Sequence, residues 1–152
     1  MMFRPGAGSP GIGWSMRRIP IIISSEERIE KIMAGKFCVS LTRSLDDPDR
    51  ATVAFVVAGA AVASGQETMV FLSIEGVRLA VEGVADAIHE EGFLPLKQLM
   101  SSFVEAGGTI LVCSPCFKKR DLDPAKLISG ALIVGGARLV EFLAQGAACV
   151  SY

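Results

Sequence analysis

The chain has few of the residues that several protein classes require. It holds one histidine, His89, and four cysteines, and their spacing does not offer the four ligands of a structural zinc site. Four cysteines are also too few for a disulfide-built scaffold in 152 residues. The longest apolar stretch, residues 51–63, is shorter than the ~20 residues that span a bilayer. We therefore expect no metal, no disulfide framework and no membrane segment.

Signals for phosphate binding are equally scarce. Fifteen basic and sixteen acidic residues nearly cancel, and the only basic run is the short cluster 118–120, whereas nucleic acid demands many clustered Lys and Arg side chains. The sequence has no P-loop, and Gly135-Gly136 alone indicates a turn rather than a dinucleotide fingerprint. We expect neither a nucleic-acid partner nor a cofactor.

The N-terminal stretch does not resemble a signal peptide. Its apolar run, residues 19–23, is short and is interrupted by Pro20. The first fifteen residues are rich in Gly and Pro, which is typical of a flexible tail. We expect a tail over residues 1–24, a single α/β domain over residues 25–152, and a reducing, cytoplasmic location.

Apolar residues are abundant, at 51% of the chain. Without a membrane span, such a fraction favours a parallel sheet buried on both faces and further surface covered by association with other copies. We therefore expect a homo-oligomer.

Strand-like and helix-like segments alternate along the chain. The turn residues Asp46, Asp47 and Pro48 predict the start of the second of the helices, and Leu96, Leu99 and Phe103 form the apolar stripe of another. The expected strands are 36–42, 67–74, 109–113, 130–134 and 147–152. The expected helices are 26–34, 48–64, 95–105, 124–128 and 138–145. Residues 77–84 are a further helix candidate, and 86–92 are expected to form an exposed loop. This alternation predicts a three-layer α/β/α sandwich with a five-stranded parallel sheet.

The segment Cys113-Ser114-Pro115-Cys116 is the main candidate for chemistry. Cys113 ends the third expected strand, and ligands of parallel sheets bind beyond the carboxyl ends of the strands. Ser114 is suited to cap a following short helix, with Pro115 as its first residue and Cys116 in its first turn. The helix dipole and the basic cluster 118–120 are then expected to favour thiolates. A thiolate attacks disulfides, accepts sulfane sulfur or binds a soft metal.

The remaining reactive residue types have simpler interpretations. Cys38 and Cys149 fall inside expected strands, where free cysteine serves as a small apolar core residue. His89 lies beside two glutamates and is expected on the surface.

A chain-long pattern supplements these local signals. The first strand is followed by Asp47-Pro48, the small-residue helix 53–61, the turn Ser64-Gly65-Gln66-Glu67 and strand 68–72. Helix 96–105 and the strand that ends in Cys113 come next. The segment 130–136 precedes the last helix and strand. The order of these segments and the location of Cys113 resemble the DsrE/DsrF-like family over residues 36–152.

The resemblance implies a parallel five-stranded α/β/α domain that often forms trimers or hexamers. It also implies, for the sulfur-relay branch, transfer of persulfide sulfur between protein cysteines through a cysteine after the third strand. Cys113 best matches that cysteine. Cys116 is not a general family feature, and it could resolve a Cys113 persulfide or mixed disulfide.

Three functions therefore stay open at this point. The first is a sulfur carrier or sulfurtransferase-like protein. Cys113 and Cys116 are then the catalytic residues, and the partners are sulfur donor and acceptor proteins. The second is dithiol/disulfide exchange by the same pair. The third is a non-catalytic oligomeric binding or regulatory subunit.

Overall fold

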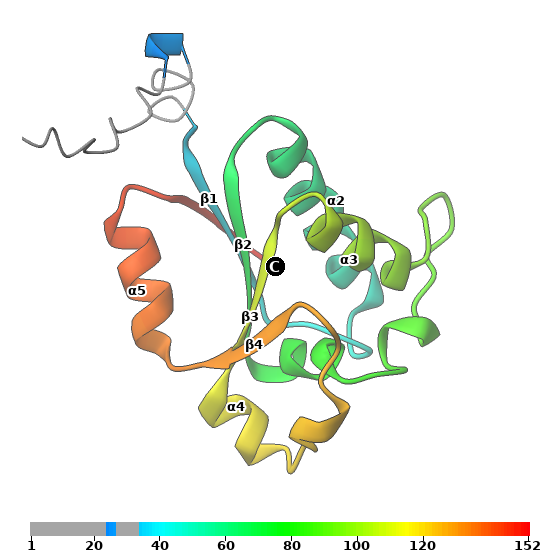
Figure 1. Cartoon of the computed structure of the whole chain (residues 1–152). Helices are drawn as coiled ribbons and strands as arrows, with labels where there is room; N and C mark the ends of the chain where they lie inside the picture. Colours follow the sequence, from blue (N-terminus) through cyan, green and yellow to red (C-terminus); the bar gives the residue numbers. More distant parts are fainter. Residues whose placement is uncertain (1–23, 27–33) are drawn as a thin grey trace, which may run out of the picture.

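Five parallel strands form one sheet, with helices on both of its faces. The computed structural model describes residues 24–26 and 34–152. The sheet has the order β4-β3-β2-β1-β5. Helices α2 and α3 cover one face, and among the described residues α5 covers the other (Figure 1). The strands are β1 (Lys36–Leu41), β2 (Glu67–Leu72), β3 (Thr109–Cys113), β4 (Ala131–Val134) and β5 (Ala148–Ser151). The helices are α2 (Pro48–Ala63), α3 (Leu96–Glu105), α4 (Ser114–Lys119) and α5 (Gly136–Ala144), with 3₁₀ helices η1 (Ile74–Ala80), η2 (Ala85–Ala87) and η3 (Pro124–Lys126). The predicted three-layer sandwich is confirmed.

Helix α2 shows how local sequence sets the ends of these elements. The Asp47 carboxylate accepts a hydrogen bond from the backbone N–H of Arg50 at 3.2 Å, so it caps the helix as expected. Pro48 occupies the first turn, where its missing N–H is not needed. Gly65 follows the helix with a φ of 77°, a left-handed conformation that glycine adopts without strain.

The two faces of the sheet bury very different amounts of apolar surface. Toward α2 and α3, alternate strand residues join a large core with Phe55 and Phe103, whose rings meet edge to face at 5.9 Å. Toward α5 the buried core is small, and it consists of Cys38, Met69, Phe71 and Leu111. Strand β2 contributes to both cores, which explains why its sequence is almost continuously apolar.

The sheet ends in two short edge strands. The side chains of β5 are mostly exposed, and on β4 Leu132 is 58% exposed. No helix among the described residues is long and apolar enough to cross a membrane.

Sequence interpretation was less accurate between β2 and α3. Of the possible helix over residues 77–84, only 77–80 are helical, and they belong to the 3₁₀ helix η1, which begins at Ile74 after the cap residue Ser73. The loop expected over residues 86–92 contains Ile88, which is only 1% exposed. The tail expected over 1–24 and the helix expected over 26–34 lie almost wholly outside the described residues.

Candidate functional site

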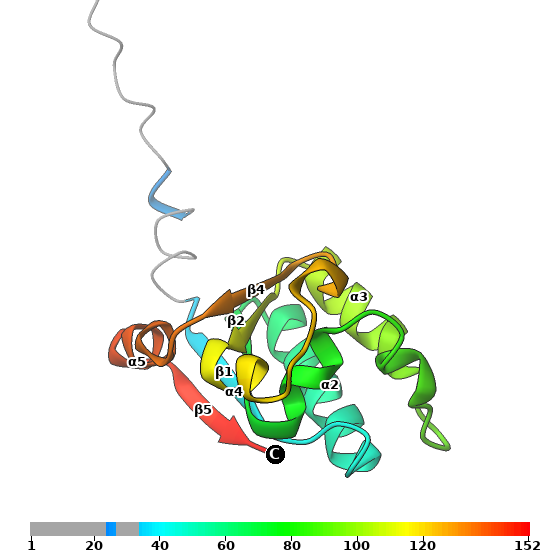
Figure 2. The same ribbon diagram turned by 90° about the horizontal axis from the view of Figure 1, so that it is seen from below.

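The candidate site lies at the carboxyl edge of the sheet, where β3 passes directly into α4. Cys113 is the last residue of β3 and also the cap of α4, with extended backbone angles of φ −64° and ψ 110°. The expectation that Ser114 caps this helix is wrong, because Ser114 is already its first residue and no side chain makes a capping bond. Helix α4 stands in front of the sheet in the view of Figure 2.

The short helix brings the two cysteines of the segment together. The backbone N–H and the thiol of Cys116 both lie close enough to Cys113 to shift the pKa of its thiol. Both cysteines are free and half-buried. On the sheet, Cys113 faces α5 and contacts the small core beside Val134.

The electrostatic balance at Cys113 differs from the sequence prediction. Burial is the largest influence and raises the pKa of the thiol, and the neighbouring Cys116 thiol raises it further. The Cys116 N–H and the positive charge of Arg120 lower it, but the net direction is upward. The expectation that the helix end and the basic cluster favour a Cys113 thiolate is therefore wrong. The N–H of Cys116, at the start of α4, lowers the pKa by less than burial raises it.

A largely buried arginine at the end of α4, Arg120, links this helix to η1. Glu75 Oε1 accepts hydrogen bonds from Arg120 Nε at 2.9 Å and pairs with Nη2 at 2.7 Å, while Arg78 Nε binds the other carboxylate oxygen at 2.7 Å. Arg120 Nη1 also donates to the Cys116 carbonyl at 3.1 Å. The Arg120 side chain is only 11% exposed. These guanidinium groups lower the pKa of Glu75. Sequence reasoning noted Arg120 only as a charge and missed Glu75, because 45 residues separate them and no local pattern links them.

The backbone before Glu75 is strained. Ile74 has a φ of 54°, which is a true outlier for a β-branched residue. Gly76 then lies so close to the end of β1 that an added Cβ would be 2.4 Å from the Leu41 carbonyl oxygen. Its N–H donates to the Thr42 carbonyl at 3.0 Å. Outliers of this kind cluster at functional sites, and this one adjoins the carboxylate that holds Arg120.

The order of elements and the place of the cysteine agree with a known family. The DsrE/DsrF-like family model matches residues 35–152. The chain belongs to this family. Among curated proteins, the uncharacterized protein MJ0989 of Methanocaldococcus jannaschii is 29% identical over 117 residues, which cover 77% of this chain and 99% of that protein. The uncharacterized protein MJ0760 of the same organism is 22% identical over 120 residues, 79% of this chain, and the chain spans 44% of its length.

Solved structures share the fold. The ychN protein from E. coli superposes with a TM-score of 0.66 at 16% identity, covering 78% of this chain and 99% of that one. The protein MTH1491 from Methanobacterium thermoautotrophicum gives a TM-score of 0.62, also at 16% identity and with the same coverage. At these identities the likeness concerns the DsrE/DsrF-like fold alone.

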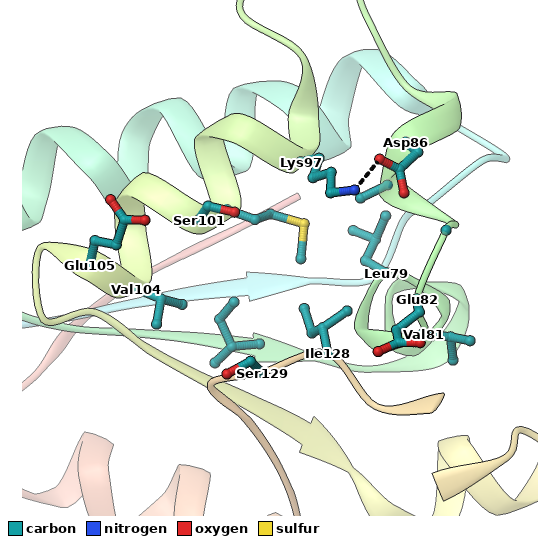
Figure 3. Close-up of a pocket in the computed structure, with 14 residues that line it drawn as sticks. Leu79, Val81, Glu82, Asp86, Lys97, Ser101, Val104, Glu105, Ile128 and Ser129 are labelled. Atoms are coloured by element: carbon teal, nitrogen blue, oxygen red, sulfur yellow. Dashed lines mark ion pairs between the residues drawn. The ribbon is translucent and has the colours of Figure 1, made fainter. Parts of the chain in front are cut away.

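Two cavities in this DsrE/DsrF-like domain lie apart from the cysteine pair. The larger, about 580 Å³, is bounded by α3 and η1, and the ion pair between Lys97 and Asp86 lies on its wall at 2.6 Å (Figure 3). The smaller, about 210 Å³, lies under α5 and is lined by Met69 and Phe142 among others. Neither of these two cavities is lined by Cys113 or Cys116.

The other residues singled out from the sequence lie away from the pair. Cys38 is fully buried, as expected of a core residue, but Cys149 is exposed, so its assignment as core filler is wrong. Strand β5 lies at the sheet edge, where an apolar sequence does not imply burial. His89 is exposed, and its Nε2 lies 3.0 Å from the Phe93 carbonyl oxygen. Within the described residues, no group of three or more His, Cys, Asp or Glu side chains could hold a metal ion.

Proposed function

We propose that Cys113 accepts a sulfane sulfur from a donor protein, holds it as a persulfide, and passes it to a cysteine of an acceptor protein. The observation that carries this proposal is a half-buried free thiol at the carboxyl end of β3, near a second thiol and the largely buried Arg120. Membership of the DsrE/DsrF-like family, in which the sulfur-relay branch uses a cysteine after the third strand, supports the same assignment.

The transfer consists of two thiol exchange steps. The Cys113 thiolate attacks the terminal sulfur of the donor's persulfide, the donor's S–S bond breaks, and the donor leaves as a thiolate. The acceptor's thiolate then attacks the terminal sulfur on Cys113, whose own thiolate is the leaving group. Each step exchanges one S–S bond for another, so no external oxidant or reductant is consumed.

The raised pKa of Cys113 has a consequence for this chemistry. At neutral pH the resting site is mainly the thiol, because burial disfavours its charged form. Such a site reacts slowly with stray disulfides and peroxides, since the thiolate is the nucleophile. We therefore expect the loading rate to rise with pH as the thiolate fraction grows.

The position of the pair favours protein partners over small molecules. Cys113 and Cys116 are half-buried at an edge of the sheet and line neither of the two cavities. A docking protein that covers this edge would exclude water from the reacting sulfurs. The sulfur donor and acceptor are accordingly proposed to be proteins.

Intact-mass spectrometry after incubation with a sulfane-sulfur donor tests the proposal. Wild type should gain the mass of one sulfur atom on Cys113, and Cys113→Ser should gain none at this site. Cys149→Ser serves as a matched control, because it removes an exposed thiol far from the pair. Peptide mapping assigns the added sulfur. Loading that survives Cys113→Ser at the same level, or no loading of the wild type, would overturn the proposal.

A second candidate function is dithiol/disulfide exchange by Cys113 and Cys116. It is favoured by the contact between the two thiols across the first turn of α4. This function predicts a reversible Cys113–Cys116 disulfide under mild oxidation, which thiol counting detects. If the protein is instead a sulfur carrier, Cys116 acts only in releasing sulfur from Cys113. The Cys116→Ser variant should then still accept sulfur on Cys113.

A further inference from the structure

A second pair of cysteines lies further along the sheet, toward its β5 edge, with Cys38 on the same α5-facing side as Cys113. Cys38 in β1 and Cys149 in β5 are direct partners in the parallel register, so their side chains leave the sheet on the same face. Neighbouring strands lie about 4.8 Å apart. That spacing falls inside the range of Cα separations, roughly 4.4–6.8 Å, that a disulfide bridges.

The two thiols of this pair differ sharply in access. Cys38 is 0% exposed and packs with Met69, Phe71 and Leu111. Cys149 is exposed on the edge strand, and its Sγ lies 3.7 Å from the Val150 carbonyl oxygen. Burial, and then the neighbouring Cys149, raise the pKa of Cys38 to about 12. The register of the two strands and the effect of Cys149 on this pKa both put the two thiols side by side.

This pair cannot exchange directly with Cys113 within one chain. Cys38 is level with Met69 of β2, and Met69 is level with Thr109 of β3. Cys113 is four residues beyond Thr109, which displaces it by about 13 Å along the strand at ~3.3 Å per residue. Across the sheet, β3 is two strands from β1, at ~4.8 Å per strand. The Cys38–Cys149 pair is therefore a separate thiol site.

We propose that Cys149 and Cys38 form a redox modification site that reacts with low-molecular-weight disulfides and closes a reversible cross-strand disulfide between β5 and β1. Cys149 is the attacking thiol, because solutes reach it, and Cys38 is the resolving thiol, because it is held beside Cys149 and is shielded from any reagent. The inference does not depend on the proposed sulfur carrier function.

The reaction has two balanced steps. The Cys149 thiolate attacks one sulfur of the small disulfide, whose S–S bond breaks and releases one small thiolate. Cys38 then loses its proton to water and attacks the Cys149 sulfur of the mixed disulfide, which releases the second small thiolate. The two protein thiols are oxidised by two electrons, and the small disulfide is reduced to two thiols.

The burial of Cys38 sets the order of rates. A thiol with a pKa near 12 is almost wholly protonated at neutral pH, so the second step is slow. A mixed disulfide on Cys149 should therefore accumulate first and then decay as the cross-strand bond forms. Once formed, the bond ties the outermost strand to the sheet.

The test uses oxidised glutathione and the double variant Cys113→Ser/Cys116→Ser, in which only this pair remains. Intact mass should first show one added glutathione, then its loss with two protein thiols that no longer react with iodoacetamide after denaturation. Peptide mapping should find a Cys38–Cys149 link. In Cys38→Ala the glutathione adduct should persist, and in Cys149→Ser none should form.

Two outcomes would overturn the inference. One is a glutathione adduct that persists in the double variant while Cys38 still alkylates after denaturation. The other is the absence of any reaction in the double variant. Circular dichroism checks that each variant is folded, and the link is sought in the double variant itself, so a misfolded Cys38→Ala leaves the test decisive. Failure of sulfur loading at Cys113 would leave this result unaffected.

Discussion

The replacement Arg120→Met separates the role of one arginine from the general basicity of α4. Methionine keeps an unbranched apolar stem of similar length, so packing changes little while the guanidinium is lost. Arg120 is 11% exposed and bonds both Glu75 and the Cys116 carbonyl. A hydrogen bond to a charged group contributes roughly 1.5–3 kcal/mol.

The expected cost of this change is smaller than the sum of its bonds. Glu75 keeps Arg78 as a partner and is 35% exposed, so water replaces part of what Arg120 provided. We expect Arg120→Met to lower the free energy of unfolding by about 2 kcal/mol. The matched control is Arg78→Met. It removes a guanidinium from the same carboxylate, but Arg78 is 40% exposed, and its loss should cost about 1 kcal/mol or less.

Urea unfolding followed by far-UV circular dichroism measures both values. A second readout is the alkylation rate of Cys113, in a background where Cys116 and Cys149 are serine. Arg120 is a charge that lowers the pKa of Cys113, so Arg120→Met should raise that pKa further and slow alkylation at neutral pH, whereas Arg78→Met should not. Equal destabilisation and equal alkylation rates in the two variants would refute this account.

Three further predictions concern other parts of the molecule. Gly76→Ala should lower the free energy of unfolding in urea by about 1–3 kcal/mol, because the added Cβ would meet the Leu41 carbonyl oxygen. The control is Gly59→Ala, in helix α2 with open space around it. It should be neutral or should stabilise the protein by up to about 1 kcal/mol. A destabilising Gly59→Ala of equal size would contradict the packing argument. The pKa of Glu75 is lowered by its arginine partners, so its stabilising contribution is present above the unfolded pKa, about 4.3, and is lost as pH falls through the lower folded value. The stability difference between wild type and Glu75→Gln should therefore shrink from pH 7 to pH 3, and a constant difference would argue against the ion pairs. Finally, light scattering should give wild type a mass above the monomer, and Leu132→Asp on the exposed edge strand should lower it; a monomeric wild type would count against oligomerisation.

Periodicity and turn residues were sufficient to predict the sheet and most helices. Local sequence was enough to predict β2 and β3 from their apolar runs and α3 from its apolar stripe. Asp47 caps α2, where the turn residues predicted a helix to begin. The region after β2 was harder to interpret, because the 3₁₀ helix η1 begins at the left-handed residue Ile74, a conformation that no sequence rule assigns to isoleucine.

The candidate site was only partly predictable. The spacing of Cys113 and Cys116 placed both near the start of one short helix, but spacing alone does not report burial, and burial determines the direction of the Cys113 pKa. The Arg120–Glu75 pair joins residues distant in sequence, so only the folded chain reveals it. Cys149 was misassigned because its apolar neighbours suggested a core strand, whereas the strand order puts β5 at the edge.

The placement of β5 beside β1 also bears on how the chain folds. Residues of β1 meet their β5 partners more than 100 positions later in the sequence, and contacts of such separation form late because closing a long loop carries a large entropic cost. Until β5 arrives, the outer side of β1 is an open row of unpaired backbone groups, to which a strand from another copy can add. We therefore expect β1 to be open to strand exchange and aggregation whenever its pairing with β5 is slow or interrupted.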